Sequence, residues 1–122
     1  MATTELTADN FDQVVTGNDM VVIDFWAPWC GPCRSFAPVF EAASAKHPEV
    51  VFAKINTDVE QELASQFGIR SIPTLMVFRQ QVILFSEPGA MSGRDLDAVL
   101  EQAKRLDMDE VRRQIAQQSQ QQ

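Results

Sequence analysis

The sequence predicts an α/β fold in which a central β-sheet of about five strands is flanked by four helices. The chain has 122 residues, 45% of them hydrophobic, which fits one soluble domain with its own core. The run Val21–Trp26 is apolar at nearly every position, a pattern typical of a central strand covered by helices on both faces. Strand and helix patterns also alternate along the chain, in the order βαβαβαββα.

The first half of the chain alternates short strands with amphipathic helices. A strand over Thr4–Leu6 precedes a helix over Ala8–Thr16, for which Thr7 is a suitable N-cap residue. After the central strand, a second helix covers about Cys33–Lys46. Pro38 lies inside this helix, where its missing N–H group should remove a backbone hydrogen bond and produce a kink.

The second half begins with a strand over Val50–Ile55 and a helix over Asp58–Phe67, which ends at a glycine. Thr74–Arg79 and Val82–Ser86 then form a predicted β-hairpin. The last helix of the fold begins at Ser92, because an acidic residue follows three positions later, as in a capping box.

The predicted hairpin has two unusual features. Its turn, Gln80–Gln81, lacks the glycine that usually supplies a positive φ angle, so we expect a turn wider than two residues. The strand after it is apolar at four successive positions, Val82–Phe85, and the family resemblance given below implies that it lies at the edge of the sheet. An apolar edge strand favours contact with a partner.

The chain continues beyond this helix, and we divide it into a domain over residues 1–106 and an extension over 107–122. Asp107 and Glu110 resemble a capping box, which predicts a break at the end of the domain and a short helix to about Gln117. The glutamine-rich end, Gln117–Gln122, is expected to be disordered. The helix either covers the apolar edge strand, mediates self-association or is a frayed tail.

Composition excludes several classes of function. The net charge is −7 and no cluster of basic residues is present, so neither nucleic acid nor an anionic membrane is an expected partner. The segment Met1–Leu6 lacks the basic and apolar features of a secretory signal, and no apolar run is long enough to span a bilayer. We therefore expect a cytoplasmic protein.

Both cysteines lie in the segment Trp29-Cys30-Gly31-Pro32-Cys33, between the central strand and the second helix. Residues three apart on a helix share one face, so a small adjustment brings these thiols to disulfide distance. Cys30 is the predicted nucleophile, because free N–H groups and the helix dipole favour a thiolate at a helix N-terminus. Cys33, less exposed, would resolve a mixed disulfide on Cys30. Pro32 suits the first turn, and Gly31 leaves room for close approach.

Two other interpretations of the cysteine pair remain open. Zinc normally takes four ligands, but the chain has no second cysteine pair, and its one histidine, His47, lies at a predicted helix end. A static structural disulfide of this spacing would close a very short loop and constrain the unfolded chain little. Redox chemistry is therefore the preferred interpretation of the cysteine pair, and no metal site is expected.

Four segments of the chain together resemble the thioredoxin family. They are Asp24–Cys33, Phe52–Asp58, Gly68–Thr74 and Gly89–Ala90, and the resemblance extends over about Leu6–Leu106. It implies a thioredoxin fold with a mixed central sheet, and the activity of a protein disulfide reductase. It also implies that no cofactor is bound and that an NADPH-dependent thioredoxin reductase recycles the Cys30–Cys33 disulfide. Electron transport and cell redox homeostasis are the corresponding cellular roles.

The resemblance also assigns roles to residues outside the cysteine motif. Asp24, a carboxylate in an apolar strand, should have a raised pKa and is expected to act as general base for Cys33, with Lys54 as its modulator. The alternative is an aspartate at a solvent-exposed edge. The Ile72–Pro73 bond is expected to be cis, with Ile72 pairing its backbone with a substrate segment.

The expected docking surface is an apolar rim around the cysteines. The substrate-binding residues are Trp29, Gly31, Pro32, Ile72, Gly89 and Ala90, and Pro73 is placed with the catalytic residues. The expected partners are client proteins that contain disulfides, together with thioredoxin reductase. A monomer is expected, although self-association through Val82–Phe85 or the C-terminal tail remains open.

Two other functions remain as alternatives. An oxidase or isomerase on the same fold would need a less stable disulfide. The Gly-Pro dipeptide between the two cysteines argues against this alternative. A binding module of another class would hold client proteins through the apolar edge strand and the tail, with the thiols incidental. The reduction potential of the cysteine pair distinguishes these functions.

Overall fold

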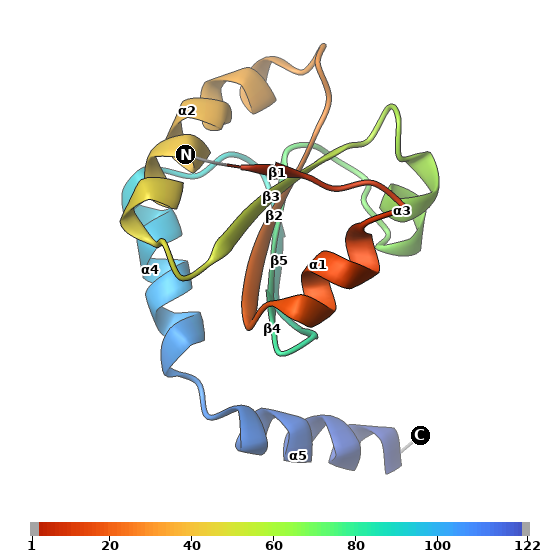
Figure 1. Cartoon of the computed structure of the whole chain (residues 1–122), viewed down its shortest axis with the longest axis vertical. Helices are drawn as coiled ribbons and strands as arrows, with labels where there is room; N and C mark the ends of the chain where they lie inside the picture. The colour runs from red at the N-terminus through yellow and green to blue at the C-terminus, as the bar shows by residue number, and fades with distance from the viewer. Residues whose placement is uncertain (1–2, 121–122) are drawn as a thin grey trace.

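A five-stranded mixed β-sheet forms the centre of the protein, with strand order β1-β3-β2-β4-β5 (Figure 1). The computed structural model describes residues 3–120. β1 and β2 each pair parallel with β3, whereas β4 pairs antiparallel with both β2 and β5. The strands are β1 (Thr4–Glu5), β2 (Met20–Trp26), β3 (Val51–Asn56), β4 (Thr74–Arg79) and β5 (Val82–Pro88). The predicted α/β class and the mixed sheet are confirmed.

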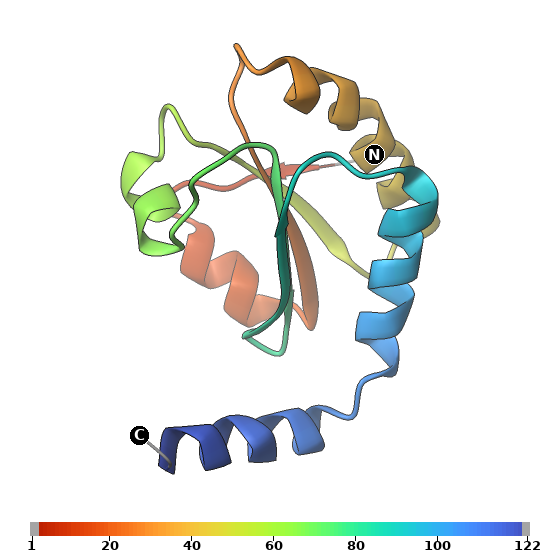
Figure 2. The same ribbon diagram turned by 180° about the vertical axis from the view of Figure 1, so that it is seen from behind.

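Helices cover both faces of the sheet. α1 and α3 pack on one face, and α2 and α4 pack on the other, as the two opposite views show (Figures 1 and 2). The helices are α1 (Phe11–Gly17), α2 (Gly31–Lys46), α3 (Gln61–Gln66), α4 (Gly93–Arg105) and α5 (Met108–Gln120). Within residues 3–120, no helix combines the length and apolar character needed to cross a membrane.

β2 is the central strand that its apolar sequence predicts. Val22 belongs to the core cluster with Phe36 of α2 and Leu100 of α4. Its neighbour Ile23 points the other way and belongs to the cluster with Val15 of α1. Because successive side chains of a strand alternate between faces, a strand that is buried on both sides needs apolar residues at nearly every position.

Two helices are shorter than their patterns predict. α1 begins at Phe11 rather than Ala8, because Oγ1 of Thr7 accepts the N–H of Asp9 (3.2 Å) and stabilises a turn before the helix. α3 covers Gln61–Gln66 within the predicted 58–67. The N–H of Asp58 donates to Oδ1 of Asn56 at 2.9 Å, so the residues before α3 form a turn.

The β4–β5 turn is tight, and the prediction of a wider turn is wrong. Arg79 pairs with Val82, so only Gln80 and Gln81 connect the strands, with φ angles of 52° and 68°. Left-handed backbone at two residues with side chains is strained. The backbone N–H of Gln80 donates to the carbonyl of Asp19 at 2.7 Å, so contacts with the start of β2 help to hold this conformation.

Arg79 links the end of α4 to the sheet. Its Nη1 donates hydrogen bonds to the carbonyl oxygens of Ala103 (2.9 Å), Lys104 (3.1 Å) and Leu106 (2.8 Å). Its Nε lies 3.5 Å from a carboxylate oxygen of Asp19. The last carbonyls of a helix have no partner within the helix, so this single guanidinium satisfies three acceptors at the end of α4.

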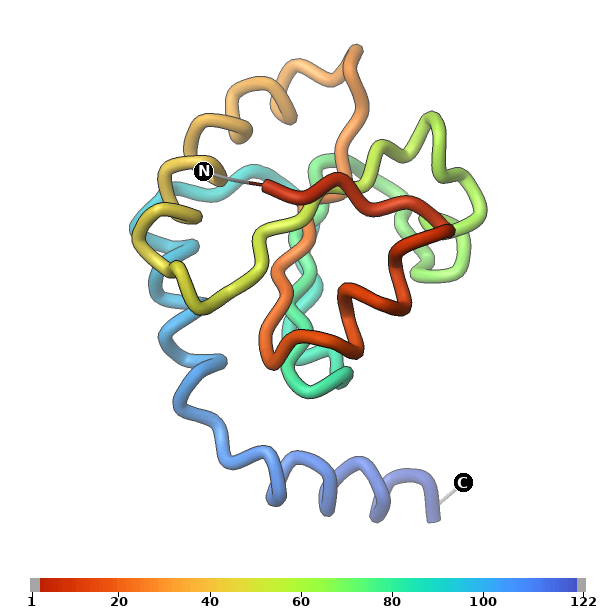
Figure 3. Tube along the Cα trace, viewed as in Figure 1, coloured from red at the N-terminus to blue at the C-terminus, as the bar shows by residue number. Residues whose placement is uncertain are grey.

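α5 begins after a break at Leu106, where the backbone is extended, and runs in a new direction (Figure 3). Oδ1 of Asp107 accepts the N–H groups of Asp109 (3.0 Å) and Glu110 (3.3 Å), so Asp107 caps the helix as predicted. The helix extends to Gln120, through residues predicted to be disordered from Gln117 onward. Glutamine is a good helix former, and a helix that has already started adds residues easily.

The last two residues lie outside the described part of the chain, and the division at 106/107 stays a prediction. The hypothesis that α5 covers the edge strand β5 also stays a prediction. Met108 is 5% exposed, whereas Ile83 of β5 and Ile115 of α5 are 45% and 43% exposed. The predicted kink at Pro38 is likewise untested, although α2 continues through this residue.

Candidate active site

The two cysteines lie at the start of α2 and form a disulfide bond, with their Cα atoms 5.2 Å apart. Cys30 is the N-cap residue of α2, and its Sγ accepts the backbone N–H of Cys33 at 3.2 Å. After reduction, the same N–H group and the helix dipole would favour a thiolate at Cys30. The predicted position of Cys30 at a helix N-terminus is therefore confirmed.

Exposure does not distinguish the two cysteines in the oxidised state, because Cys30 is 4% and Cys33 is 3% exposed. The expectation that Cys33 is the less exposed of the two thiols stays a prediction for the reduced protein. Their positions differ instead. Cys30 caps the helix, whereas Cys33 belongs to the buried side of α2 with Phe36 and Phe40.

The loop before β4 lies against the disulfide. The carbonyl oxygen of Ile72 lies 3.8 Å from Sγ of Cys30, and the side chain of Ile72 packs against the cluster that Ala27 and the two cysteines form. The Ile72–Pro73 peptide bond is cis, as the resemblance implies. This loop therefore places a backbone carbonyl beside the sulfur that would react.

Gly89 lies next to this loop, on the connection from β5 to α4. Its N–H donates to the carbonyl of Pro73 at 2.7 Å, and its φ angle of 99° is one that residues with side chains rarely adopt. Gly31, Pro32 and Ala90 are exposed, as a docking surface requires. The hydrogen bond to Pro73 thus holds Gly89 against the loop before β4, which contacts the cysteines.

Trp29 is the most exposed aromatic side chain at the site, at 67%. Its indole N–H donates to both carboxylate oxygens of Asp58, at 3.0 and 3.2 Å. This bond orients a large apolar ring beside Cys30 while leaving the ring accessible. The sequence analysis did not identify Asp58, because no local pattern indicates that a carboxylate 29 residues away reaches this ring.

Asp24 is fully buried in β2 and not at an exposed edge, so that alternative is excluded. Side chains two positions apart in a strand share one face, so Asp24 points to the same face as Val22 and Trp26. Val22 packs with residues of α2, so this is the face of the sheet that α2 covers. Neither carboxylate oxygen has a hydrogen-bond partner among residues 3–120. Burial raises the pKa of Asp24 to about 6, although the charge of Lys54 partly opposes this shift.

Lys54 is the neighbour of Asp24 in the register of β2 and β3. Its ammonium lies 4.8 Å from the centre of the Trp26 ring, a distance at which a cation is attracted to the ring face. Trp26 also packs against the cysteine cluster. The indole of Trp26, which the sequence analysis did not single out as a site residue, therefore connects the lysine to the disulfide region.

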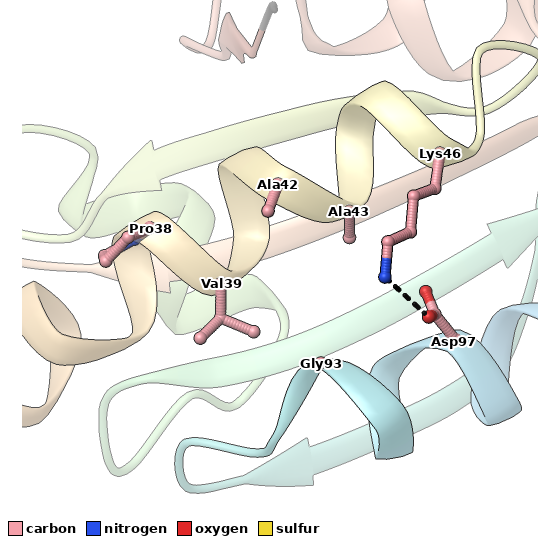
Figure 4. A pocket seen from close by; sticks show the side chains of 7 residues that line it. All are labelled: Pro38, Val39, Ala42, Ala43, Lys46, Gly93 and Asp97. Atoms are coloured by element: carbon pink, nitrogen blue, oxygen red, sulfur yellow. Dashed lines mark hydrogen bonds and ion pairs between the residues drawn. The ribbon is translucent and has the colours of Figure 1, made fainter.

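A groove of about 310 Å³ lies between α2 and α4, away from the cysteines (Figure 4). It is lined by small and apolar side chains, with the Lys46–Asp97 ion pair at one end (3.3 Å). The histidine His47 is buried near this end, and its Nε2 lies 3.0 Å from Asp97. Its Nδ1 lies 2.9 Å from Nζ of Lys104, so this ring joins α2 to α4.

Metal chemistry has no candidate site in the part of the chain that the structure describes. No group of three or more His, Cys, Asp or Glu side chains there is arranged to hold an ion. The predicted residues that do converge are Cys30, Cys33, Ile72, Pro73 and Gly89, with Trp29 beside them. This arrangement is suited to thiol–disulfide exchange with an extended segment of another protein.

Comparisons with known proteins agree with this chemistry. The thioredoxin family model matches residues 2–102. A Streptomyces coelicolor protein assigned as thioredoxin 2 is 55% identical over 117 residues, covering 96% of this chain and 87% of that protein. Thioredoxin 1 of a Nostoc species is 44% identical over 102 residues, covering 82% of this chain and 95% of that protein.

A solved structure of a thioredoxin variant from Halobacterium salinarum superposes with a TM-score of 0.78 at 32% identity, covering 88% of this chain and 98% of that chain. The sheet order and the helix layers described above are therefore those of the thioredoxin fold. The chain belongs to the thioredoxin family, and it is a thiol–disulfide oxidoreductase that acts on protein disulfides through its Cys30–Cys33 pair.

Proposed function

We propose that this protein reduces disulfides of client proteins in the cytoplasm, with Cys30 as nucleophile and Cys33 as resolving thiol. The observation that carries this proposal is the position of Cys30, which caps α2 beside the exposed Trp29 and the backbone carbonyl of Ile72. A thiolate in this position is stabilised by the helix N-terminus and lies beside the backbone of the loop at Ile72, which could pair with an extended client segment.

The reaction consists of two exchanges. The Cys30 thiolate attacks one sulfur of the client disulfide, forms a mixed disulfide and releases the other client sulfur as a thiolate. Cys33 then loses its proton, attacks Sγ of Cys30, closes the Cys30–Cys33 disulfide and releases the second client thiolate. Two electrons pass from the protein dithiol to the client, and the client thiolates take up protons from water.

Asp24 is the proposed general base for the second exchange. Its pKa of about 6 leaves it mostly ionised at pH 7 yet basic enough to accept a proton. It lies on the face of the sheet that α2 covers, and Cys33 belongs to the buried side of α2. Lys54 is the proposed modulator, because its charge favours the ionised carboxylate and its position is held by the ring of Trp26.

Client segments are proposed to bind in extended form along Ile72. The backbone of Ile72 would form the hydrogen bonds, and Trp29, Gly31, Pro32, Gly89 and Ala90 would provide the surrounding contact surface. Pro73 carries no N–H and no metal-binding side chain, so it keeps the neighbourhood of the thiols free of both.

The proposed partner for recycling is an NADPH-dependent thioredoxin reductase, because each turnover leaves the cysteines oxidised and a dithiol of lower potential must reduce them. We also propose that the protein acts as a monomer, since one copy contains both cysteines and the docking loop. A cytoplasmic location is proposed because a reductant of this type works in a reducing compartment.

The decisive experiment measures the reduction potential of the cysteine pair by equilibration with defined thiol–disulfide buffers and alkylation of each state. A potential well below that of glutathione supports the reductase, whereas an oxidising potential indicates a disulfide donor or isomerase. A Cys33→Ser variant should accumulate mixed disulfides on Cys30, and a Cys30→Ser variant should not. Failure of the pair to cycle would favour a binding module instead.

A further inference from the structure

A second surface feature adjoins the disulfide on the side of Trp29. It is a groove of about 200 Å³ whose walls include Trp29 and Ile72 and whose apolar part includes Ala64 and Ile69. Arg70 and Ser71 line it as polar residues. Ile72 lines this groove and also packs against the cysteine cluster, so the groove adjoins the place where a client segment would bind.

Arg70 is an exposed cation without an acidic partner among residues 3–120. Other arginines of the chain do form ion pairs: Arg79 with Asp19, Arg112 with Asp109 and Arg113 with Glu110. The guanidinium of Arg70 therefore remains available to a ligand. Its place in a groove beside the reactive sulfur makes that availability relevant to recognition.

The charges around the groove also determine which ligand fits. Asp58 lies beside Trp29, and both of its carboxylate oxygens accept the indole N–H of that residue. Arg34, on α2, adds a second exposed guanidinium near the motif, where it donates to the carbonyl of Pro28 at 2.9 Å. In a chain with a net charge of −7, Arg70 thus provides a local positive charge that would attract an acidic side chain.

We propose that Arg70 is a specificity-determining residue that selects client segments carrying an Asp or Glu near the reactive cysteine. This inference rests on the proposed docking of an extended segment along Ile72. Arg70 precedes Ile72 by two positions, and an extended chain advances about 3.3 Å per residue. Arg70 and Ile72 also line the same groove, so an acidic side chain about two residues from the client cysteine would come within reach of the guanidinium.

The test uses three disulfide-linked peptide dimers that differ only in having Glu, Gln or Lys two residues from the cysteine, placed on either side in separate sets. The second-order rate constant for oxidation of the reduced protein is followed by tryptophan fluorescence. Each rate is divided by that for dithiothreitol with the same peptide, because a nearby charge alters the reactivity of the disulfide itself.

In at least one set, the normalised rate should decrease from Glu to Gln to Lys, by roughly two- to fivefold per step, as expected for an exposed ion pair. In about 1 M salt, where the screening length is about 3 Å, the preference should largely disappear. Arg70→Gln should abolish the order, and Arg70→Glu should reverse it. Arg105→Gln makes the same charge change at an exposed arginine at the far end of α4 and should preserve the order.

Equal normalised rates for the three peptides in both sets, or an unchanged order in Arg70→Gln, would overturn the proposal. The Gln peptide separates this result from failure of the proposed function. If the Gln peptide is reduced without any charge preference, the reductase stands and only the role of Arg70 fails. If neither it nor the charged peptides are reduced, the proposed function fails as well.

Discussion

Arg112 of α5 donates a hydrogen bond from Nη1 to Oε1 of Gln80, at a distance of 2.6 Å. The contact joins the C-terminal helix to the glycine-free turn between β4 and β5. The amide of Gln80 also reaches Oδ1 of Asp19 at 3.2 Å, so one side chain connects three parts of the chain. The two features that the sequence analysis found unusual, the turn and the extension, therefore meet in space.

The strained turn should be improved by glycine. Gln81 has a φ angle of 68°, which a residue with a side chain adopts at a cost of about 1–2 kcal/mol. Gln81→Gly should raise the free energy of unfolding by about 1 kcal/mol, measured by urea denaturation. Gln102→Gly, in the ordinary backbone of α4, should instead lower it by about 1 kcal/mol. A loss of stability in Gln81→Gly would contradict this account of the turn.

The C-terminal helix should contribute to stability through its first turns. Met108 is 5% exposed, so ending the chain after Leu106 should lower the free energy of unfolding by about 1–3 kcal/mol and raise the binding of a hydrophobic dye. Ending it after Gln117 removes only exposed or undescribed residues and serves as control. Equal stability of both truncated proteins would show that α5 is not docked in solution.

Arg79 should be a major stabilising residue despite its position at the end of a strand. Arg79→Ala removes three hydrogen bonds to the end of α4, so the free energy of unfolding should fall by about 3 kcal/mol. Arg79→Lys keeps the charge but not the planar guanidinium, and it should recover only part of the loss. Arg105→Ala, at an exposed site, should change stability by less than about 0.5 kcal/mol.

Asp24 should destabilise the folded protein at neutral pH. Its pKa rises to about 6 from the model-compound value of 3.8, so the folded state binds more protons than the unfolded state between these pH values. Stability therefore falls as the pH rises through this range, by about 3 kcal/mol in total.

Asp24→Asn removes this dependence and should raise the free energy of unfolding by about 3 kcal/mol at pH 8 but little below pH 4. Denaturation curves of both oxidised proteins across this pH range provide the measurement. Asp9→Asn, at an exposed carboxylate, should show no such pH-dependent gain. An equal gain at pH 4 and pH 8 would indicate that the effect is not caused by ionisation.

The same substitution should slow catalysis while the fold remains intact. If Asp24 accepts the proton of Cys33, the rate of mixed-disulfide resolution in the wild type should fall as the pH decreases through about 6. Asp24→Asn should be slower at pH 7 and should lack this step. Rapid mixing of the reduced protein with a client disulfide, followed by acid quenching at increasing times, measures how fast the mixed disulfide on Cys30 forms and disappears. Unchanged turnover near neutral pH would remove Asp24 from the mechanism.

Several elements could be predicted because their causes are local. The apolar run of β2 required helices on both faces, and Asp107 capped α5 through backbone N–H groups within three residues. Cys30 lies at the start of α2 because Pro32 favours the first turn of a helix. The cis bond before Pro73 was implied by family resemblance and not by any local preference.

The class of fold, the order of its elements and the position of the reactive pair thus follow from the amino-acid sequence, since they depend on side-chain periodicity and on hydrogen bonds between near neighbours. The tight Gln80–Gln81 turn, the pairing of Trp29 with Asp58 and the contacts of Arg79 with α4 become visible only in the folded protein. These depend on groups 20 or more residues apart, whose combined contacts outweigh local backbone preferences. Local sequence patterns do not indicate which distant residues will come into contact.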